Sequence, residues 1–293
     1  MIKTDPTWDQ LPLSDLKGLV LIIGDSNTGK STLARYLYRK LSVQDQDKAA
    51  FFLDGDPGQS FLGPPTTINI SNFLDKTNSS KLPELTRRYF IGSISPRGHL
   101  LQMIVGISKL LEQIPNPESS VIIHDTTGMV KPALGGFALK TAIIDLLEPE
   151  TLIVIQRSRE LAGLILPYKL SGRTKIIELN VSGFVNIRDR EERKKYRKRK
   201  FREYFSEINH LEIGWDNFAI FPFPDFREHR LISFEDEFGF TLGLGIIKNI
   251  DWNRAVISVM SPLASLNQVN SLRIGDICLH PQTYCDRLLV NYD

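Results

Sequence analysis

The pattern that most constrains this chain is an octapeptide from Gly24 to Ser31, which reads G-x-x-x-x-G-K-S. The residues before it, 19–23, form a short apolar run that is typical of a strand buried on both faces. The residues after it, 30–41, carry a leucine at every fourth position, which predicts a helix. A strand, a glycine-bounded turn and a helix in this order predict a phosphate-binding loop on an α/β sheet.

The residue types of this loop suit a triphosphate. Gly24 and Gly29 allow backbone shapes and close approaches that a Cβ would block. Successive N–H groups and the helix N-terminus attract phosphate oxygens, Lys30 would reach the β- and γ-phosphates, and the Ser31 hydroxyl would join the Mg²⁺ shell. We therefore predict that the loop binds ATP, or another nucleoside triphosphate, with Mg²⁺. The predicted nucleotide-binding residues are Gly24, Asp25, Ser26, Asn27, Thr28, Gly29, Lys30, Ser31 and Thr32.

The rest of the chain supplies the other elements of such a sheet. Apolar runs at 49–53, 121–123, 152–155 and 175–179 alternate with helical patterns at 99–112 and 138–147. This alternation predicts a doubly wound, mostly parallel α/β sheet of the P-loop NTPase class. After about residue 225, short strands and polar turns replace long helices, which predicts a small β-rich module. We expect two domains, 1–224 and 225–293.

Carboxylates follow the second apolar run, in the sequence Asp54-Gly55-Asp56-Pro57-Gly58-Gln59. Doubly wound sheets bind ligands at the carboxyl ends of their strands. One carboxylate would hold Mg²⁺, and the other would accept the proton of an attacking hydroxyl. A simple polar turn is the alternative interpretation, but the phosphate loop in the same chain favours the functional one.

The third buried strand ends in His124-Asp125-Thr126-Thr127-Gly128, which also fits the D-x-x-G pattern of GTPases. A regulatory GTPase is therefore an alternative. The chain has no N-K-x-D motif to recognise guanine, and the nearest candidate, at 180–183, lacks both Lys and Asp. We expect ATP to be the nucleotide.

The charge of the chain is concentrated in one segment. The formal net charge is +2, but residues 188–202 hold ten Lys or Arg against three Asp or Glu, so this segment is +7 and the rest of the chain is −5. An apolar stripe of Phe201, Tyr204, Phe205 and Ile208 predicts a helix over 189–208. A solvated charged helix is the plainer interpretation, but so dense a basic run favours a polyanion, a nucleotide or a nucleic acid.

Composition narrows the class of protein. With 293 residues, 42% of them hydrophobic, the chain can bury a substantial core, and it has no apolar run of membrane-spanning length. The N-terminus has no apolar signal region. Cys278 and Cys285 are the only cysteines, and they form no zinc or disulfide framework, so we expect a cytoplasmic protein with no membrane partner.

Taken together, these segments resemble the polynucleotide 5′-hydroxyl-kinase family, whose eukaryotic members act in mRNA 3′-end formation, tRNA splicing and ribosomal-RNA processing. The likeness covers residues 19–205, and the C-terminus more loosely. Residues 54–59 look like the family's D-x-D-x-G-Q strand end, 126–130 like its T-x-G-W clasp, and 193–197 like its R-x-x-x-R lid. The stretch at 151–161 is also similar. Because the chain lacks the large flanking domains of eukaryotic members, we expect a short prokaryotic member.

The resemblance implies a role for each matching residue. Lys30 and the acidic pair Asp54 and Asp56 would act in catalysis, together with Arg193 and Arg197, which would close over the transferring phosphate. The implied Mg²⁺ ligands are Ser31, Asp54 and Asp56. The residues implied to hold the nucleic-acid end are Gln59, Thr127, Gly128 and Met129. Met129 stands where the family usually has Trp, which would weaken stacking on the terminal base, a contact worth about 1–3 kcal/mol per base.

The resemblance implies transfer of the ATP γ-phosphate to the 5′-hydroxyl end of RNA or DNA. A non-catalytic, ATP-bound adaptor in RNA processing is the alternative of a different class. The intact acidic pair and basic lid favour the enzyme.

Overall fold

The computed structural model describes residues 5–44, 49–72 and 85–289, so the last four residues of the expected β-rich module lie outside the described residues. The chain divides into two compact units, each described by itself. The first comprises residues 1–56, 69–86 and 100–188, and the second comprises 57–68, 87–99 and 189–293. These units group the chain differently from the expected division at residue 225, because the basic helix and two earlier segments belong to the second unit.

The expected α/β sheet is present, and most of its strands are parallel. Its order is β4-β3-β2-β5-β1-β6-β7. The pairs β2–β5, β5–β1, β1–β6 and β6–β7 are parallel, and β3 pairs antiparallel with β2. The strands are β1 (Gly18–Gly24), β2 (Ala50–Gly55), β3 (Thr67–Ser71), β4 (Thr86–Phe90), β5 (Val121–Thr126), β6 (Thr151–Gln156) and β7 (Lys175–Asn180).

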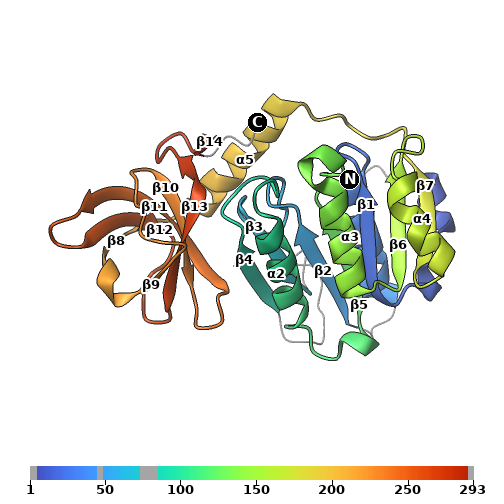
Figure 1. Cartoon of the computed structure of the whole chain (residues 1–293), viewed down its shortest axis with the longest axis horizontal. Coiled ribbons are helices and arrows are strands. Elements are labelled where there is room, and N and C mark those ends of the chain that lie inside the picture. The colour runs from blue at the N-terminus through green and yellow to red at the C-terminus, as the bar shows by residue number, and fades with distance from the viewer. Residues whose placement is uncertain (1–4, 45–48, 73–84, 290–293) are drawn as a thin grey trace. The chain divides into compact units, whose positions relative to one another are not determined.

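Every residue of β1, β2, β5 and β6 is buried, which explains why these strands read as continuous apolar runs. α1 packs against β1, β2 and β5, while α2 packs against α3. Figure 1 shows α2 and α3 on the side of the parallel strands that faces the viewer. The helices of this unit are α1 (Lys30–Gln44), α2 (Leu100–Leu111), α3 (Gly136–Leu147) and α4 (Ala162–Ser171). The predicted doubly wound P-loop fold is therefore confirmed.

A second sheet follows α5 (Arg190–Tyr204), the predicted basic helix. Its order is β14-β13-β10-β11-β12-β8, with β9 paired to β13. The β-rich C-terminal region is confirmed, although its first strand begins at Asn209, earlier than expected. Its strands are β8 (Asn209–Gly214), β9 (Ala219–Phe221), β10 (Arg230–Glu235), β11 (Thr241–Asp251), β12 (Val256–Ser261), β13 (Ser271–Leu279) and β14 (Asp286–Leu288).

Helix α5 combines a capped start with an apolar stripe. Asp189 accepts a hydrogen bond from the Glu192 N–H at 2.8 Å, and the Glu192 side chain accepts one from the Asp189 N–H at 3.1 Å, which forms a capping box. Phe201 and Phe205 are buried with Phe90 and residues of the second sheet. Ile208 lies beyond the end of the helix and is exposed, so the stripe is shorter than predicted.

Among the described residues, no helix combines the length and the apolar character needed to cross a bilayer.

Candidate active site

The phosphate loop joins β1 to α1 in the first unit. Asn27 and Gly29 have φ of 58° and 91°, in the region that glycine adopts without strain. A Cβ at Gly24 would lie 2.6 Å from the Ile155 carbonyl oxygen, so only glycine fits there. The hydroxyl of Thr28 donates to the Asp25 carbonyl at 2.9 Å and closes the turn. The loop thus has the backbone cradle that the sequence predicts.

Lys30 lies inside this cradle. Its ammonium group donates to the Asp25 carbonyl oxygen at 2.6 Å, and the side chain is only 6% exposed. Burial lowers the pKa of Lys30, while the charges of Asp125 and Asp56 oppose that shift. Lys30 is therefore a buried cation that could exchange the Asp25 carbonyl for phosphate oxygens, which suits its predicted contact with the β- and γ-phosphates.

The acidic strand ends meet at the same edge of the sheet. Asp54 of β2 is the register partner of Asp125 of β5, and Ile22 of β1 pairs with Asp125 from the other side. Asp54 and Asp125 are buried, and Asp56, just past the end of β2, is half-buried. Three carboxylates are therefore gathered beside the loop that holds Lys30.

Asp125 is the functional candidate that the sequence analysis assigned only to the GTPase alternative. The Ser31 hydroxyl hydrogen-bonds its carboxylate, while its Oδ1 atom is buried and has no hydrogen-bond partner among the described residues. Burial raises the pKa of Asp125 to about 7, and Asp54 adds to that shift. An aspartate that ends a buried strand and contacts the loop serine is the usual second Mg²⁺ anchor of P-loop NTPases. The run Val-Ile-Ile-His-Asp at 121–125 carries the signal that identifies it.

The donor set fits Mg²⁺. The ion prefers oxygen ligands, and it usually takes one or two from the protein and the rest from phosphates and water. The Ser31 hydroxyl with the Asp54 and Asp125 carboxylates meets that need. Among the described residues, no group of three or more His, Cys, Asp or Glu side chains is placed to hold a metal ion.

The predicted clasp lies against the phosphate loop. A Cβ at Gly128 would lie 2.7 Å from Ser26 Oγ and 2.9 Å from Ser26 N, so this glycine lets the two backbones touch. Thr126 donates to the Ile22 carbonyl at 2.7 Å, which fixes the start of the clasp to β1. Met129 is half-buried.

A second buried lysine, which the sequence did not suggest, lies behind the clasp. Lys140 of α3 is fully buried, and its ammonium group donates to the Thr127 carbonyl at 2.7 Å. Burial lowers the pKa of Lys140 to about 7, and the Lys30 charge acts in the same direction. A lysine in a helix is usually solvated, so no sequence signal marks this one.

Arg157, just after β6, is a further loop contact that sequence reasoning missed. Its guanidinium donates to the Asn27 carbonyl at 2.9 Å and to the Ser26 carbonyl at 3.1 Å. It lies within the stretch 151–161 that carries part of the family resemblance.

The remaining predicted residues belong to the second unit, and their roles at the reacting phosphate stay predictions. Gln59 lies in its segment 57–68, and Arg193 and Arg197 lie on α5. Within that unit, Arg197 donates through Nε and a terminal nitrogen to one oxygen of Asp286, at 3.2 and 2.9 Å. This ion pair is largely buried, with side-chain exposures of 13% and 4%.

The chain is similar in sequence and in fold to known proteins. The model of the family described as mRNA cleavage and polyadenylation factor CLP1 P-loop matches residues 24–207. The chain is 28% identical to a polyribonucleotide 5′-hydroxyl-kinase of Pyrococcus abyssi, over 88% of this chain and 86% of that protein. It is 25% identical to one from Methanocaldococcus jannaschii, with the same coverage of each.

More distant similarities extend to yeast proteins. The polynucleotide 5′-hydroxyl-kinase GRC3 of Debaryomyces hansenii is 21% identical over 84% of this chain and 36% of its own length. Among solved structures, the wild-type Clp1p–Pcf11p complex matches with a TM-score of 0.68 at 15% identity, over 93% of this chain and 77% of that one. This likeness supports the fold.

Proposed function

Because the chain belongs to the CLP1 P-loop family, we propose that it is an ATP-dependent polynucleotide 5′-hydroxyl-kinase. Relatives that align with most of its length are named polyribonucleotide 5′-hydroxyl-kinases. The observation that carries the proposal is the convergence of Lys30, Ser31 and the carboxylates of Asp54, Asp56 and Asp125 at one edge of the sheet. We also propose a cytoplasmic location, in keeping with the cysteine content.

The reaction is an in-line phosphoryl transfer. The 5′-oxygen of the polynucleotide bonds to the γ-phosphorus of ATP while the bond from that phosphorus to the β–γ bridging oxygen breaks, and ADP leaves. A carboxylate accepts the hydroxyl proton. Asp54 is buried and faces Asp125, whereas Asp56 is half-exposed at the strand end, so Asp56 is better placed to meet the substrate.

The other residues position the two substrates and neutralise the charge of the phosphates. Ser31, Asp54 and Asp125 would hold Mg²⁺, which when bound offsets the charge of the β- and γ-phosphates. Lys30 releases the Asp25 carbonyl and contacts the triphosphate. Thr127 and Gly128 hold the nucleic-acid end, with Met129 as an apolar contact and Gln59 beside the hydroxyl.

Arg193 and Arg197 supply the positive charge that stabilises the transferring phosphoryl group, a contribution worth about 10³–10⁵ in rate in related reactions. Arg188 exchanges two hydrogen bonds with the Asn27 side chain, each 3.2 Å long. Arg193 follows five residues later, so the chain tethers it within about 18 Å of Arg188. Arg197 would have to exchange Asp286 for phosphate oxygens.

The test is incubation with γ-labelled ATP and 5′-hydroxyl oligonucleotides of RNA and DNA side by side. We expect label on the 5′ end, lost in Lys30→Ala and retained in Lys40→Ala, which removes an exposed lysine of α1. No transfer under conditions in which ATP binds would support the adaptor instead. Displacement of ATP by low concentrations of GTP would support the GTPase.

A further inference from the structure

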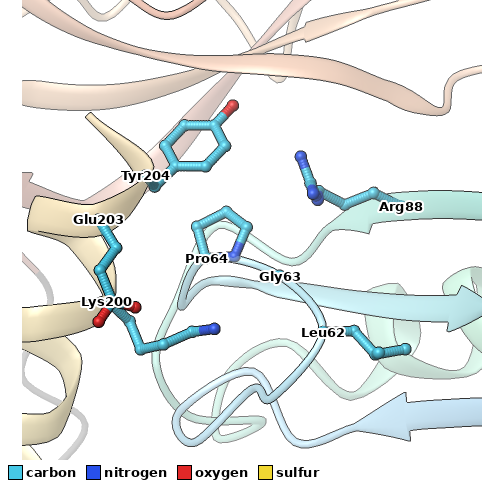
Figure 2. A pocket seen from close by; sticks show the side chains of 7 residues that line it. All are labelled: Leu62, Gly63, Pro64, Arg88, Lys200, Glu203 and Tyr204. Carbon is cyan, nitrogen blue, oxygen red and sulfur yellow. The ribbon is translucent and has the colours of Figure 1, made fainter. Parts of the chain in front are cut away.

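A small pocket in the second unit is outside the machinery described so far. Its volume is about 220 Å³, below the range of about 300–1,000 Å³ of sites that enclose whole drug-sized ligands. Figure 2 shows it between α5, the turn after Phe61 and β4. The lining residues are Leu62, Gly63, Pro64, Arg88, Lys200, Glu203 and Tyr204.

Two cations from different elements are fixed at this pocket. Lys200 and Tyr204 lie one turn apart on α5 and share a face. The Lys200 ammonium donates to the Phe61 carbonyl at 2.8 Å, which holds it at the turn. The Arg88 guanidinium of β4 lies 5.6 Å from the centre of the Tyr204 ring, and the Tyr204 hydroxyl accepts from the Leu244 N–H at 2.8 Å. Both charges are thus held in place before a ligand arrives.

The one carboxylate at the rim has its own partner on α5. Glu203 pairs with Arg199 of the same helix at 2.9 Å. The pocket is thus lined by two cations, Arg88 and Lys200, and one carboxylate, and it lies beside a helix that carries nine Lys or Arg against three Glu. Its volume and charge suit a phosphate group more than an entire nucleotide.

We propose that this pocket binds a backbone phosphodiester of the polynucleotide, downstream of the end that is phosphorylated. The inference rests on the proposed kinase function and extends it to a second substrate contact. Leu62 follows Gln59 by three residues within the same unit, so no more than about 11 Å of chain separates the pocket from the residue proposed to sit beside the 5′-hydroxyl. A strand that leaves that end can therefore reach the pocket within a few nucleotides.

The experiment compares wild type with Lys200→Gln and Arg88→Gln. Glutamine keeps a donor for the Phe61 carbonyl while removing the Lys200 charge. Arg202→Gln is the matched control, because it removes an equal charge from an exposed position on α5 that does not line the pocket. Thermal melts of each variant check folding, and if Arg88→Gln melts early, Lys200→Gln carries the test alone.

The measurements are KM and kcat for 5′-hydroxyl oligoribonucleotides of increasing length at saturating ATP, over a range of salt. Each pocket variant should raise KM about fivefold at about 0.1 M salt for long strands, and reduce the slope of log KM against log salt by about 0.7. Substrates too short to reach the pocket should keep the wild-type KM, and kcat should be unchanged. Equal changes in Arg202→Gln, or no change in either pocket variant, would overturn the proposal.

Anisotropy of a labelled oligonucleotide without ATP separates this proposal from the proposed function. If wild type transfers no phosphate but the pocket variants still bind the strand more weakly than the control, the kinase assignment fails and the pocket stands. If wild type binds no strand, the pocket assignment fails too. A titration with inorganic phosphate completes the set: phosphate binding lost in the pocket variants, with an unchanged oligonucleotide KM, would assign the site to free phosphate and overturn the polynucleotide.

Discussion

The strand ends around Lys30 and the basic helix α5 both gather charge, but they do so in opposite environments. Around the phosphate loop and the clasp, Lys30, Asp125 and Lys140 are buried, and burial is the main cause of each pKa shift. On α5, five of the nine cations are exposed, and two of the less exposed ones have specific acceptors: Arg197 donates to Asp286 and Lys200 donates to the Phe61 carbonyl. Burying a charge costs free energy, so buried charges suit a rigid site that binds one small group. Exposed charges suit a long polyanion, whose binding weakens as salt increases.

The largest expected effect is at the buried site. Lys30→Met should reduce kcat/KM at least about 10³-fold, because it removes a desolvated cation that would contact the transferring phosphate. The measurement is transfer of the γ-phosphate to a 5′-hydroxyl oligonucleotide, with folding checked by the melting temperature. A loss of less than tenfold would mean that the buried site does not carry the chemistry.

The exception on α5 should behave like a buried site. Asp286→Ala leaves the Arg197 guanidinium largely buried without this carboxylate, so we expect a loss of about 3 kcal/mol in the free energy of unfolding. Chemical denaturation of the full chain measures it. If the free energy of unfolding changes by less than about 0.5 kcal/mol, the Arg197–Asp286 pair contributes no more than a solvent-exposed ion pair.

Lys140→Met should weaken activity while stabilising the fold. Losing the donor to the Thr127 carbonyl should lower kcat about tenfold. A native pKa near 7, against 10.5 unfolded, means that wild-type stability falls as pH drops from 10.5 toward 7 and stays at that lower level below it. The variant lacks this penalty, so its melting temperature should exceed that of wild type by more at pH 6 than at pH 10.

Lys131→Met is the matched control for Lys140, since Lys131 is exposed and precedes the short 3-10 turn at Pro132–Leu134. It should change neither kcat nor the pH dependence of melting. If the difference in melting temperature between Lys140→Met and wild type does not change with pH, folding does not lower the pKa of Lys140 and the prediction is wrong.

The smallest effect belongs to the exposed surface of α5. Arg199→Ala breaks an ion pair with Glu203 whose side chains are 61% and 53% exposed. Such pairs contribute about 0.2–1 kcal/mol, and salt screens them. Denaturation at low and high salt measures the change, and a loss above about 2 kcal/mol would contradict the contrast with Asp286.

Much of the fold was predictable because its signals are local. The runs before Gly24 and Asp54 identify buried strands, and the strand ends locate the carboxylates. Helix α4 gave no clear signal because Pro167 lies inside it, where proline usually ends a helix. Strands β3 and β4 are short and lie on either side of a polar stretch, so their patterns are weak.

The site was only partly predictable, because its less obvious members depend on tertiary burial. Asp125 carries a strand-end signal that two families of P-loop protein share. Lys140 and Arg157 act through backbone carbonyls, and no residue spacing encodes such contacts. The Arg197–Asp286 pair joins positions 89 residues apart, which pattern analysis of one sequence does not connect.

The two compact units are each built from three separate stretches of the chain, which limits how the chain can be divided into fragments that fold. The polypeptide passes between them five times, and Phe90, from the first third of the chain, shares a core with Phe201 and Phe205. A fragment that starts at Asp189 would lack Phe90 and the rest of residues 57–68 and 87–99, so we expect that it would not fold on its own. We therefore expect that an exchange of the C-terminal sheet between proteins must transplant residues 57–68 and 87–99 along with it.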